Sequence, residues 1–370
     1  MTRRPVPQNV ASPAMLECLE PRKLLCDWHG IGHAAAWARE VSQLNAHQLT
    51  PTPPDEGEDV RPRVENLART SLTWSWKQSM PQRREEGANA VLNGRLYVFG
   101  GFYDHTFNGT GRVDAYNPST NSWQQRASMP EAITHAASLT INGEAWLFGG
   151  YVGKDPGPAT KRVYIYNPNS NSWRRGPDMP FSRGAAAAAR LGDNVYVFGG
   201  RNLDRTYDVA PTFAFNLKTN TWSTKANLPN PRNHLAAAEI GGKIYAIGGQ
   251  HREASKAVNQ RSVHRYDPAT NTWSSVASLP FAQSHNLAST FAYNGRIIVV
   301  GGETAHNVAA GRVLVYEPWR NTWRDAGGLP EARRAPQAGI INGKLYVAGG
   351  SIRGGQRGDL WVSNSLDSIL

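Results

Sequence analysis

Cysteine is nearly absent from this 370-residue chain, which holds only Cys18 and Cys26, both near the N-terminus. Two cysteines exclude a disulfide-stapled scaffold, and the rest of the chain has no thiol for chemistry. No apolar run approaches the ~20 residues that a membrane-spanning helix needs, so we expect no membrane span. Charged residues make up 19% and apolar residues 40%, a composition typical of a globular protein.

Common catalytic motifs are also missing. The sequence contains no GxSxG elbow, P-loop, HExxH or CxxC. Its net charge of +11, from 40 Lys and Arg against 29 Asp and Glu, permits nonspecific attraction to polyanions. Aromatic and basic residues are not interleaved, however, and no nucleic-acid motif occurs, so we expect no nucleic-acid partner.

What the sequence does contain is a repeat from about residue 72 onward. Glycine pairs that end apolar runs begin at Gly100, Gly149, Gly199, Gly248, Gly301 and Gly349, at spacings of 49, 50, 49, 53 and 48 residues. In five copies an aromatic residue precedes a Trp by seven positions, and a proline follows that Trp by seven, as in Tyr116, Trp123 and Pro130. Four short strands every ~50 residues are typical of a β-propeller blade.

With these spacings, residues 72–364 resemble kelch-repeat proteins, whose blades carry a glycine pair, a Tyr and a spaced Trp. The resemblance implies an all-β, six-bladed kelch β-propeller. Small residues suit the crowded innermost strands, as at 136–137, 185–189, 236–238 and 288–289. We expect the glycine pair to allow a backbone approach that a Cβ would block, and Tyr and Trp to fill the space between blades.

The sixth blade is incomplete at the C-terminal end, where the chain stops after a plausible third strand at 359–364. Trp74 precedes Pro81 by the same seven positions but has no glycine pair before it. We therefore expect residues 72–77 to supply the outer strand of the last blade and to remove an open sheet edge. The predicted domains are an N-terminal segment (1–71), the propeller (72–364) and a C-terminal tail (365–370).

The first 71 residues lack the repeat and are expected to be poorly structured. One short helix is possible over 34–47, and 50–63 reads as a Pro-rich, acidic linker. Leu19-Glu20-Pro21-Arg22-x-Leu24-Leu25 resembles the LEPR-x-LL sorting motif of large secreted or surface proteins in some bacteria. No apolar signal region follows Arg3-Arg4. The resemblance implies a secreted or cell-surface location, with the cytoplasm as the alternative.

The loop that leads from each Trp strand to the next blade supplies the candidate site. Counted from its proline, the third position reads Arg84, Ile133, Arg183, Arg232, Gln283 and Arg333, and the fifth reads Glu86, His135, Ala185, His234, His285 and Ala335. Repeat symmetry places equivalent positions around one channel mouth, and positions three and five share a side if the backbone is extended. The pattern predicts four Arg around the mouth, with Glu86 and three His beside them.

This cluster has three interpretations. Arg at the third position could pair with backbone carbonyls of an adjoining blade, a purely structural role. Alternatively, forked guanidiniums could bind carboxylates, and the resemblance implies acidic peptides or acidic sugars as ligands. His135, His234 and His285 could also bind a metal, but they come from different blades, and zinc needs nitrogens within ~2.1 Å. We therefore expect no metal site.

A second candidate surface consists of the variable loops after the glycine pairs, at 102–111, 151–160, 250–260 and 303–311. The main hypothesis is a non-enzymatic, monomeric recognition module that binds a protein, or an acidic glycan or peptide, through one loop face. The alternative, implied by six-bladed kelch relatives, is a sialic acid mutarotase (N-acetylneuraminate epimerase-like). In it the Arg cluster would hold the carboxylate, and a His or Glu would move the proton.

No cofactor is expected. Copper-radical oxidases with kelch propellers need a cysteine cross-linked to a tyrosine, and residues 72–364 contain no cysteine.

Overall fold

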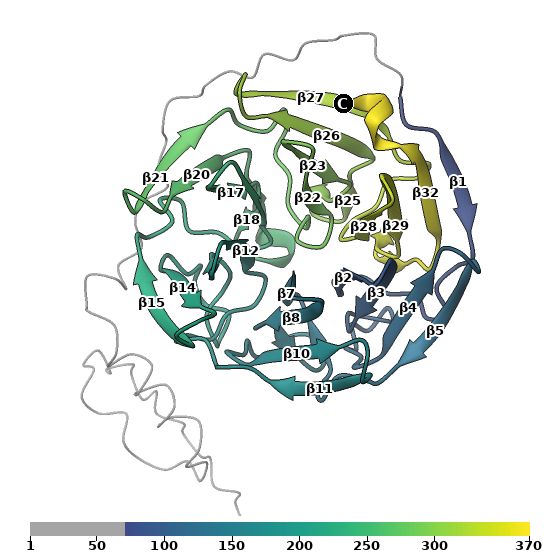
Figure 1. Cartoon of the computed structure of the whole chain (residues 1–370), viewed down its shortest axis with the longest axis horizontal. Helices are drawn as coiled ribbons and strands as arrows, with labels where there is room; N and C mark the ends of the chain where they lie inside the picture. Colours follow the sequence, from purple (N-terminus) through teal and green to yellow (C-terminus); the bar gives the residue numbers. More distant parts are fainter. Residues whose placement is uncertain (1–70) are drawn as a thin grey trace, which may run out of the picture. The chain divides into compact units, whose positions relative to one another are not determined.

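The computed structural model describes residues 71–370. They form six four-stranded antiparallel sheets that follow one another around a central axis (Figure 1). The predicted six-bladed, all-β propeller is therefore confirmed. No helix among these residues is long and apolar enough to cross a membrane. The sorting-motif resemblance, the possible helix at 34–47 and the linker at 50–63 lie outside the described residues.

The strands of each blade are short, and a tight turn or a loop joins each strand to the next. Numbered from the innermost strand outward, blade 1 holds β2 (Ala88–Leu92), β3 (Arg95–Phe99), β4 (Val113–Asn117) and β5 (Ser122–Arg126). Blade 2 holds β7 (Ala137–Ile141), β8 (Glu144–Phe148), β10 (Val163–Asn167) and β11 (Ser172–Arg175). Blade 3 holds β12 (Ala187–Leu191), β13 (Asn194–Phe198), β14 (Thr212–Asn216) and β15 (Thr221–Lys225).

The remaining blades repeat the pattern. Blade 4 holds β16 (Ala236–Ile240), β17 (Lys243–Ile247), β20 (Val263–Asp267) and β21 (Thr272–Val276). Blade 5 holds β22 (Thr290–Tyr293), β23 (Arg296–Val300), β26 (Arg312–Glu317) and β27 (Thr322–Gly328). Blade 6 holds β28 (Gln337–Ile341), β29 (Lys344–Ala348), β32 (Leu360–Ser365) and β1 (Trp74–Lys77).

Blade 6 closes the ring as predicted. Strand β1 pairs antiparallel with β32, with Trp74 opposite Ser363, and the two strands run side by side at the rim of Figure 1. The indole Nε1 of Trp74 donates a hydrogen bond of 2.8 Å to the carbonyl of Gly328 in blade 5. After β32, the 3₁₀ helix η3 (Leu366–Ile369) buries Leu366 and Ile369 in the core, so the last residues are packed rather than a free tail.

The glycine pairs join neighbouring blades through the backbone. The amide of Gly101 donates to the Ile133 carbonyl of the next blade at 3.0 Å, and that of Gly150 donates to the Arg183 carbonyl at 3.0 Å. Gly100 has φ +60°, and a Cβ added there would lie 2.1 Å from the Ile133 oxygen. The expected close approach is confirmed, because a side chain would collide with the neighbouring blade.

Tyr, Trp and Asn make a repeated contact between blades. In blade 4 the Trp273 indole donates to the Ala226 carbonyl of blade 3 at 3.1 Å. Asn271 Oδ1 accepts hydrogen bonds from the Tyr266 hydroxyl and from the Ala226 amide. The same arrangement recurs in blades 1, 2 and 5. Strand order and these contacts together fix where each loop leaves the sheet.

Candidate functional site

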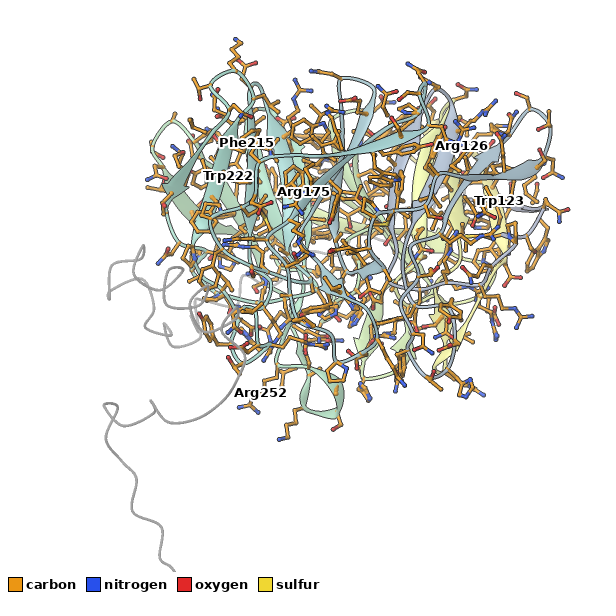
Figure 2. All side chains as sticks on the ribbon, turned by 90° about the horizontal axis from the view of Figure 1, so that it is seen from below. Trp123, Arg126, Arg175, Phe215, Trp222 and Arg252 are labelled. Atoms are coloured by element: carbon orange, nitrogen blue, oxygen red, sulfur yellow. The ribbon has the colours of Figure 1, made fainter. Side chains whose placement is uncertain are left out.

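The two surfaces predicted separately from the sequence form one face of the propeller. Because strand direction alternates, the connection between the second and third strands leaves a blade at the same end as the connection to the next blade. Short β-bridges join the two kinds of loop, as between Glu85 and Phe102 and between Ser284 and Glu303. We call this end the mouth face. Arg252, on one of its loops, lies at the lower edge of the molecule in Figure 2.

A pocket of about 880 Å³ opens on the mouth face. Loops from blades 1 to 5 supply its wall, and His135, His234, His285 and Arg334 line it as well. Three of these loops take part in two-stranded pairs: β6 (Ile133–Thr134) with β9 (Tyr151–Val152), β18 (Gln250–His251) with β19 (Val258–Asn259), and β24 (Glu303–Ala305) with β25 (Val308–Ala309). In blade 6, β30 (Ser351–Ile352) pairs with β31 (Gly355–Gln356) outside the pocket lining. The 3₁₀ helix η2 (Ala254–Lys256) adds Ala254 to the wall.

The fifth-position residues converge because their backbones form an arc around the axis. The amide of each donates to the carbonyl of the previous one, from Glu86 through His135, Ala185 and His234 to His285, at 2.9–3.1 Å. All six fifth-position residues have φ between 47° and 60°, in the left-handed region. This turn directs their side chains toward the axis.

Three imidazoles from blades 2, 4 and 5 therefore lie in contact. The ring centroids of His234 and His285 are 4.1 Å apart, and those of His135 and His234 are 4.9 Å apart. The expectation that different blades would hold these histidines too far apart is wrong. Burial lowers the pKa of all three rings well below the usual range, so each is neutral at physiological pH.

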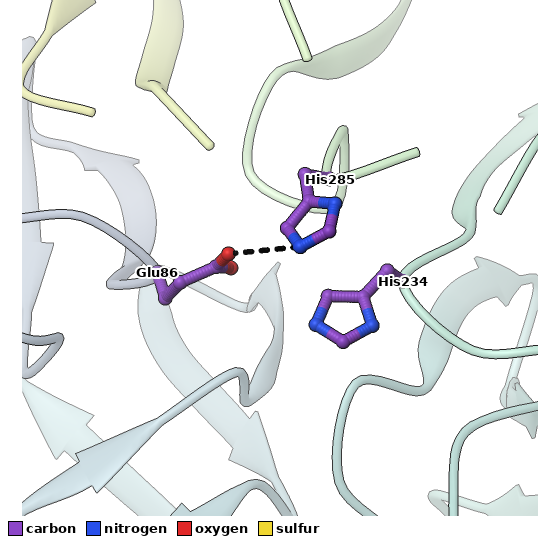
Figure 3. Close-up of side chains that lie close together, drawn as sticks. All are labelled: Glu86, His234 and His285. Carbon is purple, nitrogen blue, oxygen red and sulfur yellow. Dashed lines mark ion pairs between the residues drawn. The ribbon is translucent and has the colours of Figure 1, made fainter. Parts of the chain in front are cut away.

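Glu86 lies among these rings. Its Oε2 is 3.4 Å from Nε2 of His135, and its Oε1 is 3.3 Å from Nε2 of His285 (Figure 3). Burial raises the pKa of the Glu86 carboxyl to about 8. Oε1 is buried and has no hydrogen-bond partner, although it is within ion-pair distance of Arg334.

The residue before each histidine orients its ring. Asn233 Oδ1 lies against Nδ1 of His234, Ser284 Oγ is 2.7 Å from Nδ1 of His285, and Thr134 Oγ1 is 2.8 Å from Nδ1 of His135. Asn233 Nδ2 donates to the Asp208 carboxylate, which leaves Oδ1 as the acceptor for the ring. The Ser284 hydroxyl faces two amide oxygens, so it donates to one of them and accepts from His285. In His234 and His285, Nδ1 therefore carries the proton and Nε2 presents a lone pair.

Arg334, Glu85 and Glu303 complete the cluster; sequence reasoning missed Arg334 and Glu85 and included Glu303 only as part of the loop 303–311. Arg334 donates to Glu303 through Nε and to Glu85 through Nη1 at 2.7 Å, while Nη2 is 3.1 Å from Nε2 of His285. Glu85 and Arg334 occupy the fourth position of the same loops, and Glu303 directly follows a glycine pair. The available signal for Glu85 and Arg334 was the fourth position itself, which is polar in every blade except blade 3, where it is Gly184.

The four predicted arginines, by contrast, do not face the mouth. Arg84, Arg183, Arg232 and Arg333 are each 0% exposed. Arg183 donates to the carbonyls of Gly199 and Pro211, and Arg232 donates to those of Asn230 and Ala246.

Arg84 and Arg333 bind carboxylates inside the blades, those of Asp114 and Asp359. The predicted ring of guanidiniums at the mouth is therefore not formed. The left-handed fifth position breaks the assumed extended alternation, so the third and fifth side chains point to different places. Pairing with backbone carbonyls, the structural interpretation, describes Arg183 and Arg232, whereas Arg84 and Arg333 also bind carboxylates.

A second charged cluster forms one wall of the pocket. The Arg205 guanidinium lies 4.2 Å above the Tyr151 ring and pairs with Asp155 at 2.6 Å and with Glu253 at 2.8 Å. The Tyr151 hydroxyl donates to Glu253 at 2.7 Å. The acidic side chains that line the pocket are Asp155, Asp204, Glu253 and Glu303, and the arginines that line it are Arg205 and Arg334. With neutral histidines, the lining is not cationic.

These features define a β-propeller with a ligand-sized pocket at one mouth, and comparison with known proteins gives the family. The profile for the KLHDC2/KLHL20/DRC7 Kelch-repeats domain matches residues 134–350, and the Kelch motif profile matches residues 83–130. The chain belongs to the kelch-repeat family, whose propeller fold is typical of protein-interaction modules.

Individual relatives match only a part of the chain. Human Kelch-like protein 33 is 39% identical over 90 residues, which cover 24% of this chain and 16% of that protein. The F-box/kelch-repeat protein At1g67480 of Arabidopsis thaliana is 34% identical over 93 residues, covering 25% of this chain and 24% of that protein. The chain thus spans less than a quarter of the length of these two relatives.

A solved structure extends the likeness to the whole propeller. The structure titled "Structure of YjhT" superposes with a TM-score of 0.63 at 18% identity, covering 77% of this chain and 96% of that one. At this identity the likeness concerns the fold alone.

Proposed function

We propose that this chain is a non-enzymatic recognition module that binds a protein or glycan partner through the mouth face. The observation that carries this proposal is the distribution of exposed hydrophobic side chains on the propeller. Six large hydrophobic side chains are strongly exposed among the described residues, and four of them lie on the loops around the pocket: Tyr103, Tyr207, Val258 and Val308. Exposed aromatic and aliphatic groups around a concave centre are typical of an interaction site.

The pocket itself suits an inserted side chain or sugar ring. A volume of about 880 Å³ lies in the range of ligand pockets, roughly 300–1,000 Å³. Phe102, Phe107 and Leu203 supply apolar lining beside the charged groups. Because Arg205 and Arg334 already pair with carboxylates, we expect shape and hydrogen bonding to select the partner rather than attraction to an acidic group.

The mutarotase alternative receives less support from this geometry. It depends on the arginine cluster to hold a carboxylate, and Arg84, Arg183, Arg232 and Arg333 are buried in contacts within the blades. A proton-transfer group would be available in Glu86 or a histidine, but the predicted clamp beside it is missing. Mutarotase activity is therefore not proposed, and its detection would count against the recognition function.

The test is selection of binders from a random peptide library and a glycan array with the full chain, followed by affinity measurement on variants. We expect Tyr103→Ser and Tyr207→Ser each to weaken a selected binder about tenfold or more. Trp319→Ser is the matched control, because Trp319 is 59% exposed on a turn at the opposite end of its blade. Binders sensitive to Trp319 but not to the two tyrosines would contradict the proposal. So would accelerated anomer exchange of sialic acid, followed by NMR.

We also propose export to the cell surface or medium, which rests on the resemblance of residues 19–25 to a sorting motif. Cell fractionation of the full chain and of a Leu24→Asp/Leu25→Asp variant tests this. Export of the native chain that the variant loses is the expected result, and retention of both in the cytoplasm would contradict it.

A further inference from the structure

We propose that Glu86, His234 and His285 bind a divalent transition-metal ion where the pocket meets the propeller axis. This site goes beyond the recognition function and does not depend on it. One carboxylate and two imidazoles form a donor set that suits Zn²⁺ and other first-row divalent ions, with coordination positions left open.

The three side chains lie close to the spacing that one shared ion needs. One donor atom from each of the three side chains lies within 4.8 Å of the other two. Donors that bind zinc at about 2.0–2.2 Å are separated by at most about 4.4 Å, so a small inward movement closes the site. Figure 3 shows the Glu86 carboxylate and the two rings facing a common space.

Hydrogen bonds already orient the donor atoms of both histidines. Nδ1 of His234 and of His285 is held by Asn233 and Ser284, so both rings direct an Nε2 lone pair away from these anchors. Metal-bound histidines typically donate their other ring N–H in this way. Glu86 is 6% exposed, and its Oε1 has no hydrogen-bond partner, so a buried acceptor faces the space without being satisfied.

The charged groups buried beside Glu86 carry an excess of negative charge. Glu85 and Glu303 both pair with Arg334, and the three side chains sum to one negative charge. When a bound metal displaces the proton of Glu86, the carboxylate adds a second negative charge, and the divalent cation brings the group to neutrality. Buried charges are costly unless neutralised, so the cluster favours a cation over an anion.

The guanidinium of Arg334 competes with a metal ion for His285 and Glu86, and its contacts indicate how it could be displaced from these two side chains. Its Nη2 lies 3.1 Å from Nε2 of His285 and 3.3 Å from Oε1 of Glu86. Its other nitrogens are bound to Glu85 and Glu303, which hold the guanidinium when Nη2 gives up these two contacts. The pocket lies on the open side, so water or a bound partner could reach the ion.

The experiment uses the full chain with Cys18→Ser and Cys26→Ser, which removes the two thiols as metal ligands. After treatment with a chelator, Zn²⁺ is titrated by calorimetry and Co²⁺ by its visible absorption. We expect one Zn²⁺ per chain, and Co²⁺ bands without a sulfur charge-transfer band. His234→Gln and His285→Gln should each weaken binding at least ~100-fold. His306→Gln, an exposed histidine on the same pocket wall, should leave it unchanged.

A folding defect is separated from loss of a ligand by unfolding each variant in chelator. Asn233→Ala keeps all three donors and should weaken Zn²⁺ binding about 10–100-fold through the orientation of His234. The proposal is overturned if the parent chain binds no Zn²⁺, or if both histidine variants keep the affinity of the parent. Peptide or glycan binding measured with and without chelator tests the recognition function separately.

Discussion

Nε2 of His285 lies 3.3 Å from Oε1 of Glu86, although the two residues belong to the fifth and first blades. The contact arises because both residues adopt the left-handed backbone conformation in the arc of hydrogen bonds around the axis. A repeated loop position thus becomes a single site, to which blades 1, 2, 4 and 5 contribute Glu86 and three histidines, whereas blades 3 and 6 have alanine at this position. Formation of the site therefore depends on closure of the ring of blades.

Deletion of residues 72–81 tests that closure. The deletion removes β1, exposes the backbone edge of β32 and removes the hydrogen bond from Trp74 to Gly328. We expect unfolding in urea, followed by tryptophan fluorescence and circular dichroism, to become broad and to differ between the two probes. The control is a chain that starts at residue 71. One sharp transition at the control's midpoint would contradict the expectation.

Gly100→Ala and Gly192→Ala form a matched pair of substitutions. Comparing them distinguishes the cost of a left-handed backbone from the cost of a Cβ colliding with the neighbouring blade. The two glycines have φ +60° and φ +59°, but a Cβ at Gly100 would lie 2.1 Å from the Ile133 oxygen, whereas Gly192 faces open space. We expect Gly192→Ala to lower the free energy of unfolding by about 1–2 kcal/mol, the cost of the left-handed backbone. Gly100→Ala should lower it by more than about 4 kcal/mol or prevent folding. Equal losses in denaturant titrations would show that the blades can move apart.

The Tyr–Asn contact between blades predicts that substitution of Asn271 costs more stability than substitution of Asn220. Asn271 accepts from the Tyr266 hydroxyl and the Ala226 amide, whereas Phe215 and Pro177 stand at the equivalent places around Asn220 and offer no donor. Glycine tolerates the positive φ at both sites, so Asn271→Gly should cost about 1–3 kcal/mol and Asn220→Gly close to none. Equal effects in thermal unfolding would contradict this role for the contact.

The buried imidazole of His264 is expected to cause part of the loss of stability in acid. Its imidazole is 3% exposed beside Arg232, and burial lowers its pKa to about 3. In the unfolded chain the ring takes up a proton near pH 6.5, whereas in the folded chain it does so only near pH 3. The contribution of His264 to the free energy of unfolding is therefore fully present above about pH 6.5. It falls by about 1.4 kcal/mol per pH unit from there toward about pH 3.

His264→Gln should remove this contribution. Between pH 7.5 and pH 5 we expect the variant to lose about 2 kcal/mol less free energy of unfolding than the parent chain. His105→Gln, at an exposed position, is the control and should behave as the parent does. An unchanged pH dependence in His264→Gln would show that other groups account for the acid sensitivity.

Much of the mouth face was also predictable from the repeat. The loops after the glycine pairs and the loops before each inner strand were both identified, and alternation of strand direction places them at one end. The arginines were misplaced because the third and fifth positions were treated as neighbours in an extended segment. Six left-handed residues break that alternation, and although His is enriched in this conformation, the Glu and Ala residues at the equivalent positions do not signal it in advance.

Sequence periodicity alone determined the number of blades, the strands in each, the blade completed by residues 72–77 and the need for glycine at the blade contacts. These features follow from local rules, since turn residues, strand alternation and small inner residues repeat at fixed offsets. Only the tertiary structure decided that His135, His234, His285 and Glu86 meet while Arg84 and its equivalents turn inward. That outcome depends on closing the ring, which brings loop positions about fifty residues apart or more into contact around one axis.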